Sequence, residues 1–163
     1  MIIYLKNKHT LLVDDFQFRC SIGKKGLSKN KLEGDFCTPK GFFKLEKLFY
    51  RKDRLKLVKT KLKSTPITKD MFWCNDPNSI YYNKLKKRSE GFTSERVFRS
   101  DQKYDYLIPI SYNRKKILKN KGSAIFIHLT KDYKPTAGCI ALKITDFKIM
   151  LKIIKKNTFI KIS

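Results

Sequence analysis

The sequence predicts a mainly β fold, a mostly antiparallel sandwich or barrel with one C-terminal helix and long surface loops. Three observations support this expectation: short apolar runs alternate with polar residues, glycine and proline separate these runs, and one segment near the C-terminus repeats apolar residues with helical spacing. The chain has 163 residues, which is a usual size for one domain. We therefore expect residues 1–163 to form a single domain.

The N-terminal half contains the alternating runs that predict the first strands. We place these strands at 1–5, 10–14, 16–22 and 42–49. In the segment 33–43, Pro39 and Gly41 supply the turn chemistry ahead of the last strand. Residues 51–100 are irregular and heavily charged, and we expect them to form long loops over the sheet.

The C-terminal part predicts two more strands, one helix and a closing strand. The two strands are expected at 104–110 and 124–129. Thr145 can cap a helix that runs to about Lys155, and its apolar residues share one face: Phe147, Met150, Leu151 and Ile154. The alternating segment 158–162 is expected to end the chain as a strand.

The net charge of +24, from 38 Lys and Arg against 14 Asp and Glu, indicates anionic partners or surroundings. The lysines are spread along the whole chain, and no RNA-recognition, zinc-finger or basic-zipper signature accompanies them. A solvated surface is therefore the favoured interpretation, and nucleic acid is not the expected partner. No segment approaches the roughly 20 apolar residues that cross a bilayer, so we expect no membrane span.

Four cysteines (Cys20, Cys37, Cys74 and Cys139) and two histidines give no C-x-x-C pair and too few ligands for a convincing zinc site. We expect no metal, no cofactor and no disulfide framework. The first residues lack the basic region and the apolar run of a signal peptide. We therefore expect a cytoplasmic location, with the periplasm or cell envelope as the alternative.

The segment 123–147 contains the residues with the strongest chemical character. Its first strand ends in His128, a polar ring on an otherwise apolar run, and Cys139 follows eleven residues later, directly after Gly138. A thiol has a pKa of about 8.5, and an imidazole within hydrogen-bond reach can accept its proton to give a nucleophilic thiolate. Gly138 leaves room for a substrate, and backbone N–H groups at such a turn can stabilise an oxyanion.

Cys139 is therefore the candidate nucleophile, and His128 is the candidate base. The alternative from these residues alone is a buried core histidine and a chance Gly-Cys pair. The second histidine, His9, lies in the polar stretch KNKHT, which favours a hairpin turn, and is the weaker candidate.

The histidine, a spacer and the segment Thr136-Ala137-Gly138-Cys139-Ile140-Ala141-Leu142 resemble the signature of the YkuD-type L,D-transpeptidase catalytic domain. The stretch EGDFCTPKGFF at 33–43 resembles the family segment G-x-x-T-P-x-G-x-F. The segments 73–83, 95–113 and 122–129 resemble a compact subfamily that consists almost entirely of this domain. The resemblance covers nearly the whole chain.

The resemblance implies a YkuD-like β fold with Cys139 as nucleophile and His128 as base. It implies, as substrate, the tetrapeptide stem of bacterial peptidoglycan, which is cut between a diamino acid and the terminal D-alanine. The stem then remains on the cysteine as an acyl-thioester. An amine from a second stem gives a cross-link, and water gives an L,D-carboxypeptidase reaction.

Two positions depart from the family signature. Ala137 replaces the histidine before Gly-Cys, and Ala141 replaces the Asn or Arg that follows the cysteine by two residues. With these departures and a cytoplasmic location, we expect water as the acceptor, as in wall recycling. The alternative is a non-catalytic basic module that binds wall peptides or nucleic acid.

The remaining site residues are assigned by position. Four are candidates for contacts to the substrate or the oxyanion: Thr136, Ala137, Gly138 and Asn113, the last at a strand end. Three charged residues could orient the base or bind carboxylates, although structural ion pairs are the simpler interpretation: Arg99, Asp101 and Asp105. We expect Trp73 and Tyr82 to pack in the core.

Overall fold

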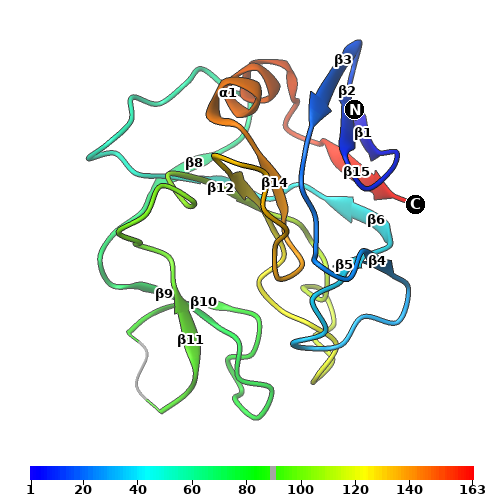
Figure 1. Cartoon of the computed structure of the whole chain (residues 1–163). Coiled ribbons are helices and arrows are strands. Elements are labelled where there is room, and N and C mark those ends of the chain that lie inside the picture. The colour runs from blue at the N-terminus through cyan, green and yellow to red at the C-terminus, as the bar shows by residue number, and fades with distance from the viewer. Residues whose placement is uncertain (89–90) are drawn as a thin grey trace.

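The computed structural model describes residues 1–88 and 91–163, and in these ranges it contains two five-stranded sheets, two smaller sheets and one helix (Figure 1). The first sheet has the order β3-β2-β1-β15-β6. Its strands are β3 (Phe16–Arg19), β2 (Thr10–Val13), β1 (Ile2–Leu5), β15 (Phe159–Ile162) and β6 (Gly41–Lys44). The two ends of the chain meet here, because β1 pairs in parallel with β15.

The second sheet contains His128 and has the order β14-β13-β12-β7-β8. Its strands are β14 (Ile140–Leu142), β13 (Phe126–Leu129), β12 (Tyr106–Pro109), β7 (Leu48–Tyr50) and β8 (Ser64–Pro66). β12 lies antiparallel to β13 and to β7. β14 lies parallel to β13, and this pairing determines the geometry of the site.

The inner faces of the two large sheets and the helix α1 (Ile144–Ile153) share one hydrophobic core. The helix contributes Phe147, Met150 and Leu151, all fully buried. The ring of Phe147 stacks on Tyr106 of β12, with centroids 5.6 Å apart. α1 therefore packs against the second sheet, and the helix itself lies at the end of the molecule seen at the top of Figure 1.

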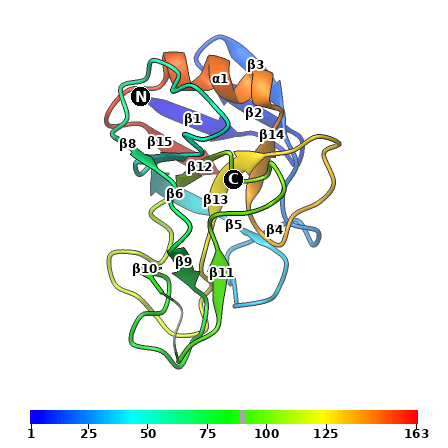
Figure 2. The ribbon, with the colours of Figure 1, turned by 90° about the vertical axis from the view of Figure 1, so that its left-hand side faces the viewer.

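A small sheet lies at the opposite end of the molecule from α1 (Figures 1 and 2). It consists of β10 (Leu85–Lys87), β9 (Met71–Cys74) and β11 (Ser94–Arg96) in the order β10-β9-β11. Trp73 of β9 packs edge-on against Phe126 of β13, with ring centroids 4.8 Å apart. This contact centres a second hydrophobic cluster that also includes Cys139. A two-stranded sheet of β4 (Leu27–Ser28) and β5 (Thr38–Pro39) completes the fold.

The expected mainly β sandwich with one helix is confirmed, and in the described ranges the sheets stay open, so the barrel alternative is not formed. The single strand expected at 42–49 is wrong. It divides into β6 and β7, which belong to different sheets. The division occurs because Leu45 N–H bonds to Thr158 O (2.9 Å) while Glu46 N–H bonds to Pro109 O (2.9 Å).

Two further expectations are corrected. The segment 51–100 is not only loop, because β8, β9, β10 and β11 lie in it. Apolar side chains such as Trp73 and Val97 are buried there despite the surrounding charge. Thr145 is not the helix cap: Lys143 occupies the N-cap position without a side-chain cap bond, and the helix begins at Ile144. No helix in the described part of the chain has the length and apolar character to cross a membrane.

Replacing Phe147 with Ala tests the role of α1. The substitution removes a fully buried ring and should lower the free energy of unfolding by about 3–5 kcal/mol. Ile149→Ala on the same helix is the matched control, because Ile149 is exposed; we expect a change within about 0.5 kcal/mol. Urea unfolding followed by circular dichroism measures both, and equal effects would contradict the assigned packing.

Candidate active site

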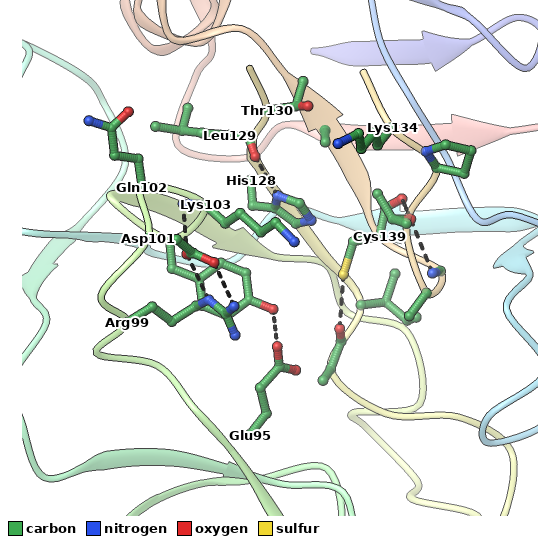
Figure 3. Close-up of a pocket in the computed structure, with 18 of the residues that line it drawn as sticks. Glu95, Arg99, Asp101, Gln102, Lys103, His128, Leu129, Thr130, Lys134 and Cys139 are labelled. Atoms are coloured by element: carbon green, nitrogen blue, oxygen red, sulfur yellow. Dashed lines mark hydrogen bonds and ion pairs between the residues drawn. The ribbon is translucent and has the colours of Figure 1, made fainter. Parts of the chain in front are cut away.

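The parallel pairing of β13 and β14 brings His128 and Cys139 together. His128 on β13 is level with Ala141 on β14, and Cys139 directly precedes β14. Both side chains line a cleft of about 1040 Å³. Figure 3 shows the imidazole and the sulfur facing each other across this space. The structure therefore brings together the two residues that the sequence predicts as base and nucleophile.

The turn before Cys139 is held by its own threonine. The Thr136 hydroxyl donates to Cys139 O at 2.6 Å and accepts from Gly138 N–H at 3.1 Å. Gly138 has φ of +143°, and a Cβ there would lie 2.8 Å from Cys37 O. A side chain at this position would therefore clash with backbone as well as strain the turn. Ala137, at the tip of the turn, is exposed and lines the cleft.

Thr38 anchors the same turn from the other side, and the sequence analysis missed it. Its hydroxyl is fully buried, accepts from Gly23 N–H at 2.9 Å and donates to Gly138 O at 2.8 Å. The segment EGDFCTPKGFF thus contributes a hydrogen bond to the residue directly before Cys139. The signal was a threonine between Cys37 and Pro39, in a segment that resembles a family motif but was given no role at the site.

The thiol of Cys139 is nearly closed off from solvent, with 8% of the residue exposed. Its sulfur accepts from Phe126 N–H at 3.4 Å and donates to Ala124 O at 3.2 Å. Burial raises the pKa of the thiol to about 12, and the Glu95 carboxylate acts in the same direction. The Phe126 N–H and the Lys31 ammonium oppose this rise in pKa.

The imidazole of His128 is held in the tautomer that a base needs. Its Nδ1 lies 2.8 Å from Leu129 O. A carbonyl oxygen can only accept, so Nδ1 carries the proton and the lone pair remains on Nε2. Burial lowers the pKa of His128 to about 4, and the charges of Lys103 and Arg99 act in the same direction. Thiol and imidazole are therefore both neutral at pH 7.

A buried tyrosine forms one wall beside the histidine. The ring of Tyr104 meets the His128 ring edge-on at a centroid distance of 5.4 Å. Its hydroxyl donates to the Glu95 carboxylate, and burial raises the pKa of Glu95. Arg99 lies 5.2 Å from the Tyr104 ring centroid and pairs with Asp101 through two bonds of 2.9 and 2.6 Å. Both Tyr104 and Glu95 lie in the segment 95–113 that resembles the compact subfamily, but sequence reasoning gave neither a role at the site.

The three charged candidates form ion pairs, as the simpler interpretation expected. Arg99 pairs with Asp101, and Asp105 pairs with Arg54 at 3.0 Å. These residues also line the cleft. Trp73 and Tyr82 are buried in the core, as expected.

Asn113 lies away from the residues that line the cleft. Its amide nitrogen donates to Leu118 O at 3.0 Å and to Gly122 O at 2.9 Å, while its oxygen accepts from Leu118 N–H at 2.8 Å. The side chain closes the loop between β12 and β13, and nothing in its position supports the expected contact with substrate or oxyanion. All four cysteines are free, and the described ranges contain no group of three or more His, Cys, Asp or Glu residues that could hold a metal.

The resemblance to YkuD domains implied a β sandwich with a cysteine and a histidine side by side, and the structure has both residues at one cleft. The sequence matches the family model of the YkuD L,D-transpeptidase catalytic domain over residues 1–162. The chain belongs to this family, whose members are generally L,D-transpeptidases that act on peptidoglycan.

Solved structures with the same fold include proteins from two bacteria. The helical cell shape determining protein Pgp2 from Campylobacter jejuni is 18% identical with a TM-score of 0.50, over 99% of this chain and 46% of that chain. Bd1075 from Bdellovibrio bacteriovorus is 15% identical with a TM-score of 0.53, over 99% of this chain and 47% of that chain. This chain therefore spans less than half the length of either neighbour. No curated protein matches it.

The neutral state of the thiol predicts a characteristic pH dependence. Because the raised pKa keeps Cys139 protonated near pH 7, its alkylation by iodoacetamide should rise about tenfold per pH unit between pH 7 and 10. Peptide mass spectrometry separates Cys139 from the other cysteines. A plateau of high reactivity at neutral pH would indicate a thiolate–imidazolium pair and contradict the assignment.

Removing the Thr38 hydroxyl tests the anchor of the turn. Thr38→Val deprives Gly23 N–H and Gly138 O of their buried partner and should lower the free energy of unfolding by about 1–3 kcal/mol. Thr93→Val is the control, because Thr93 is exposed. Chemical unfolding measures the stability of both variants. Equal free energies of unfolding would contradict the role of Thr38 as the anchor of the turn.

Proposed function

We propose that this chain is a cysteine-dependent L,D-transpeptidase-family enzyme that acts on the tetrapeptide stem of peptidoglycan and releases D-alanine. The observation that carries the proposal is the placement of a thiol and an imidazole with a free Nε2 in one cleft. Membership of the YkuD family supports the substrate class.

In the proposed reaction, the Cys139 sulfur attacks the carbonyl carbon of the residue before D-alanine. The thiol proton passes to His128 Nε2, a C–S bond forms, and the carbonyl electron pair moves to oxygen. When the tetrahedral intermediate collapses, the C–N bond breaks and the imidazolium returns the proton to the amino group of the leaving D-alanine. An acyl-thioester on Cys139 remains, and an amine or water then releases the stem.

The neutral resting pair fits a proton transfer that is coupled to attack. The thiol at rest donates to Ala124 O rather than to the imidazole. Turning the Cys139 side chain toward Nε2 gives up two weak hydrogen bonds, to Ala124 O and from Phe126 N–H. Substrate binding also removes water from the cleft. A neutral imidazole loses less hydration free energy in that step than a charged one does. The low pKa of His128 therefore keeps the base available at neutral pH.

The nucleophile turn supplies the proposed oxyanion donor. Gly138 N–H is already bonded to Thr136 Oγ1, so we assign the oxyanion to the backbone N–H of Cys139. Because Thr136 uses its hydroxyl on Cys139 O, its proposed role is to shape the turn and not to contact the substrate.

The charge of the cleft is close to balanced. Six cationic side chains line it (Lys31, Arg54, Arg99, Lys103, Lys131 and Lys134), against five carboxylates (Glu33, Glu95, Asp101, Asp105 and Asp132). Arg54, Arg99 and Lys134 pair with Asp105, Asp101 and Asp132. The cleft lining therefore adds little to the attraction of an anionic stem peptide beyond that of the net charge.

We propose water as the acceptor. Ala137 is exposed beside the turn, while Ala141 is buried on β14, where its backbone bonds to Ser21. Neither position offers a polar side chain that would hold an incoming amine. The favoured products are therefore a tripeptide and D-alanine, and cross-linking is the second outcome.

A binding module without turnover is the alternative that one observation favours. The Cys139 thiol is 8% exposed and its pKa is raised, as expected for a structural cysteine. On this interpretation the cleft would hold a wall peptide without cutting it.

Intact-mass spectrometry after mixing the protein with a free tetrapeptide stem tests the proposal. We expect an adduct on Cys139 with release of D-alanine, and tripeptide as the final product. Cys139→Ala should abolish both, and His128→Gln should slow acylation by about 10²–10⁴-fold. Cys37→Ala is the control, because Cys37 is a free thiol outside the cleft lining.

Three outcomes separate the alternatives. Release of D-alanine by Cys139→Ala contradicts the assigned nucleophile. Dimer without tripeptide, with a second stem present, contradicts water as the acceptor. Saturable stem binding by the wild-type chain without any adduct or D-alanine supports the binding module.

A further inference from the structure

The proposed reaction does not use Lys31, a lysine buried beside the nucleophile turn. Only 4% of Lys31 is exposed, although lysine is almost never fully buried unless it is paired. It belongs to the segment between β4 and β5, far from Cys139 in sequence, and lines the same cleft.

The ammonium group has two acceptors close by. Lys31 Nζ donates to Asp35 Oδ1 at 2.7 Å and to Leu32 O at 3.2 Å. The Asp35 carboxylate is shared, because it also accepts the N–H groups of Leu32 and Cys37, each at 2.8 Å. Asp35 is half-buried, so its negative charge is partly screened by solvent while the ammonium is not.

One glycine makes the space that this side chain occupies, and a second glycine lies beside its ammonium group. A Cβ at Gly122 would lie 2.9 Å from Lys31 Cε, so the lysine stem fills the position of a side chain there. A Cβ at Gly138 would lie 3.5 Å from Lys31 Nζ. The positive end of the Lys31–Asp35 pair therefore lies against the residue that directly precedes Cys139.

Burying an ammonium is costly even when it is paired. A neutral side chain of similar length would pack in the same space without that cost. The retained charge therefore needs a reason besides holding the segment 31–37, and the adjacent nucleophile turn is where negative charge must form during acyl transfer.

We infer that the Lys31 ammonium is a fixed positive charge that stabilises the negative charge developing on the Cys139 sulfur and on the carbonyl oxygen under attack. The part that concerns the oxygen rests on the proposed function. The part that concerns the sulfur does not, because thiolate formation can be measured without substrate.

Four titratable groups lie around the thiol, and burial is the main cause of its raised pKa. His128, Glu95 and Tyr104 line the cleft with it, and Lys31 lies behind the turn. Glu95 raises the pKa of Cys139, and Lys31 lowers it. Within this set Lys31 supplies the cation that opposes both burial and the nearby carboxylate.

The test is the rate of Cys139 alkylation by iodoacetamide between pH 7 and 10, followed by peptide mass spectrometry. Lys31→Met keeps the packed stem and removes the charge. We expect its rate to fall at least threefold across the whole range, so that the pH profile is displaced in parallel. Removing a nearby positive charge raises the thiol pKa by about one unit or more, which lowers the thiolate fraction. The more basic thiolate is also more nucleophilic, and this offsets part of the loss.

Two controls separate the charge from a structural role. Lys134→Met removes an exposed lysine of the same cleft and should leave the rate within twofold of the wild-type chain. Asp35→Asn breaks the pair but keeps the ammonium, so it should retain more reactivity than Lys31→Met. Thermal unfolding of each variant verifies that the chain is folded.

An unchanged rate in Lys31→Met, or equal losses in Lys31→Met and Asp35→Asn, would overturn the inference. If Lys31→Met does not fold, Asp35→Asn decides: a loss of threefold or more in that variant rejects the role of the charge. The outcome is independent of the stem-peptide experiment. A chain that shows the Lys31 effect but forms no adduct retains the inference for sulfur and rejects the proposed function.

Discussion

The parallel register of β13 and β14 is the constraint on which the site depends. Parallel neighbours usually need a long crossover, yet here the short loop 130–139 connects them. The loop closes because it pairs with another segment: Thr136 N–H bonds to Ile22 O at 2.8 Å, and Lys24 N–H bonds to Thr136 O at 2.9 Å. The residues that position Cys139 therefore come from distant parts of the chain.

The electrostatic character of the site follows from how tightly the sheets close over it. Burial disfavours the charged form of both groups, which is why the pKa of Cys139 is raised and that of His128 is lowered. Because both groups are uncharged at rest, neither needs a counter-ion. The backbone groups that bond to the two side chains are Ala124 O, Phe126 N–H and Leu129 O, so β13 and the residues just before it supply these hydrogen bonds.

The sequence predicted the site residues that lie in the Gly-Cys motif and at the end of its strand. It missed the residues that reach the site only through tertiary contacts. His128, Gly138 and Cys139 could be placed from strand alternation, spacing and family resemblance. Lys31 and Glu95 could not, because their importance follows from burial against a segment far along the chain.

The same limit applies to the fold. Alternation predicted β1 and β2 within a residue at each end. It failed at the segment 42–49, where an unbroken run passes from one sheet to the other, and in 51–100, where surface charge obscured the buried residues of β9. Local pattern identifies strands, but the choice of partner strand depends on contacts that the pattern does not contain.

The sheltered thiol has a consequence for the lifetime of the protein under oxidative stress. Peroxides react with the thiolate and not with the thiol, and they need access to the sulfur. With Cys139 8% exposed and its pKa near 12, very little thiolate is present between pH 6 and 8. The resting chain therefore resists conversion of Cys139 to sulfenic acid.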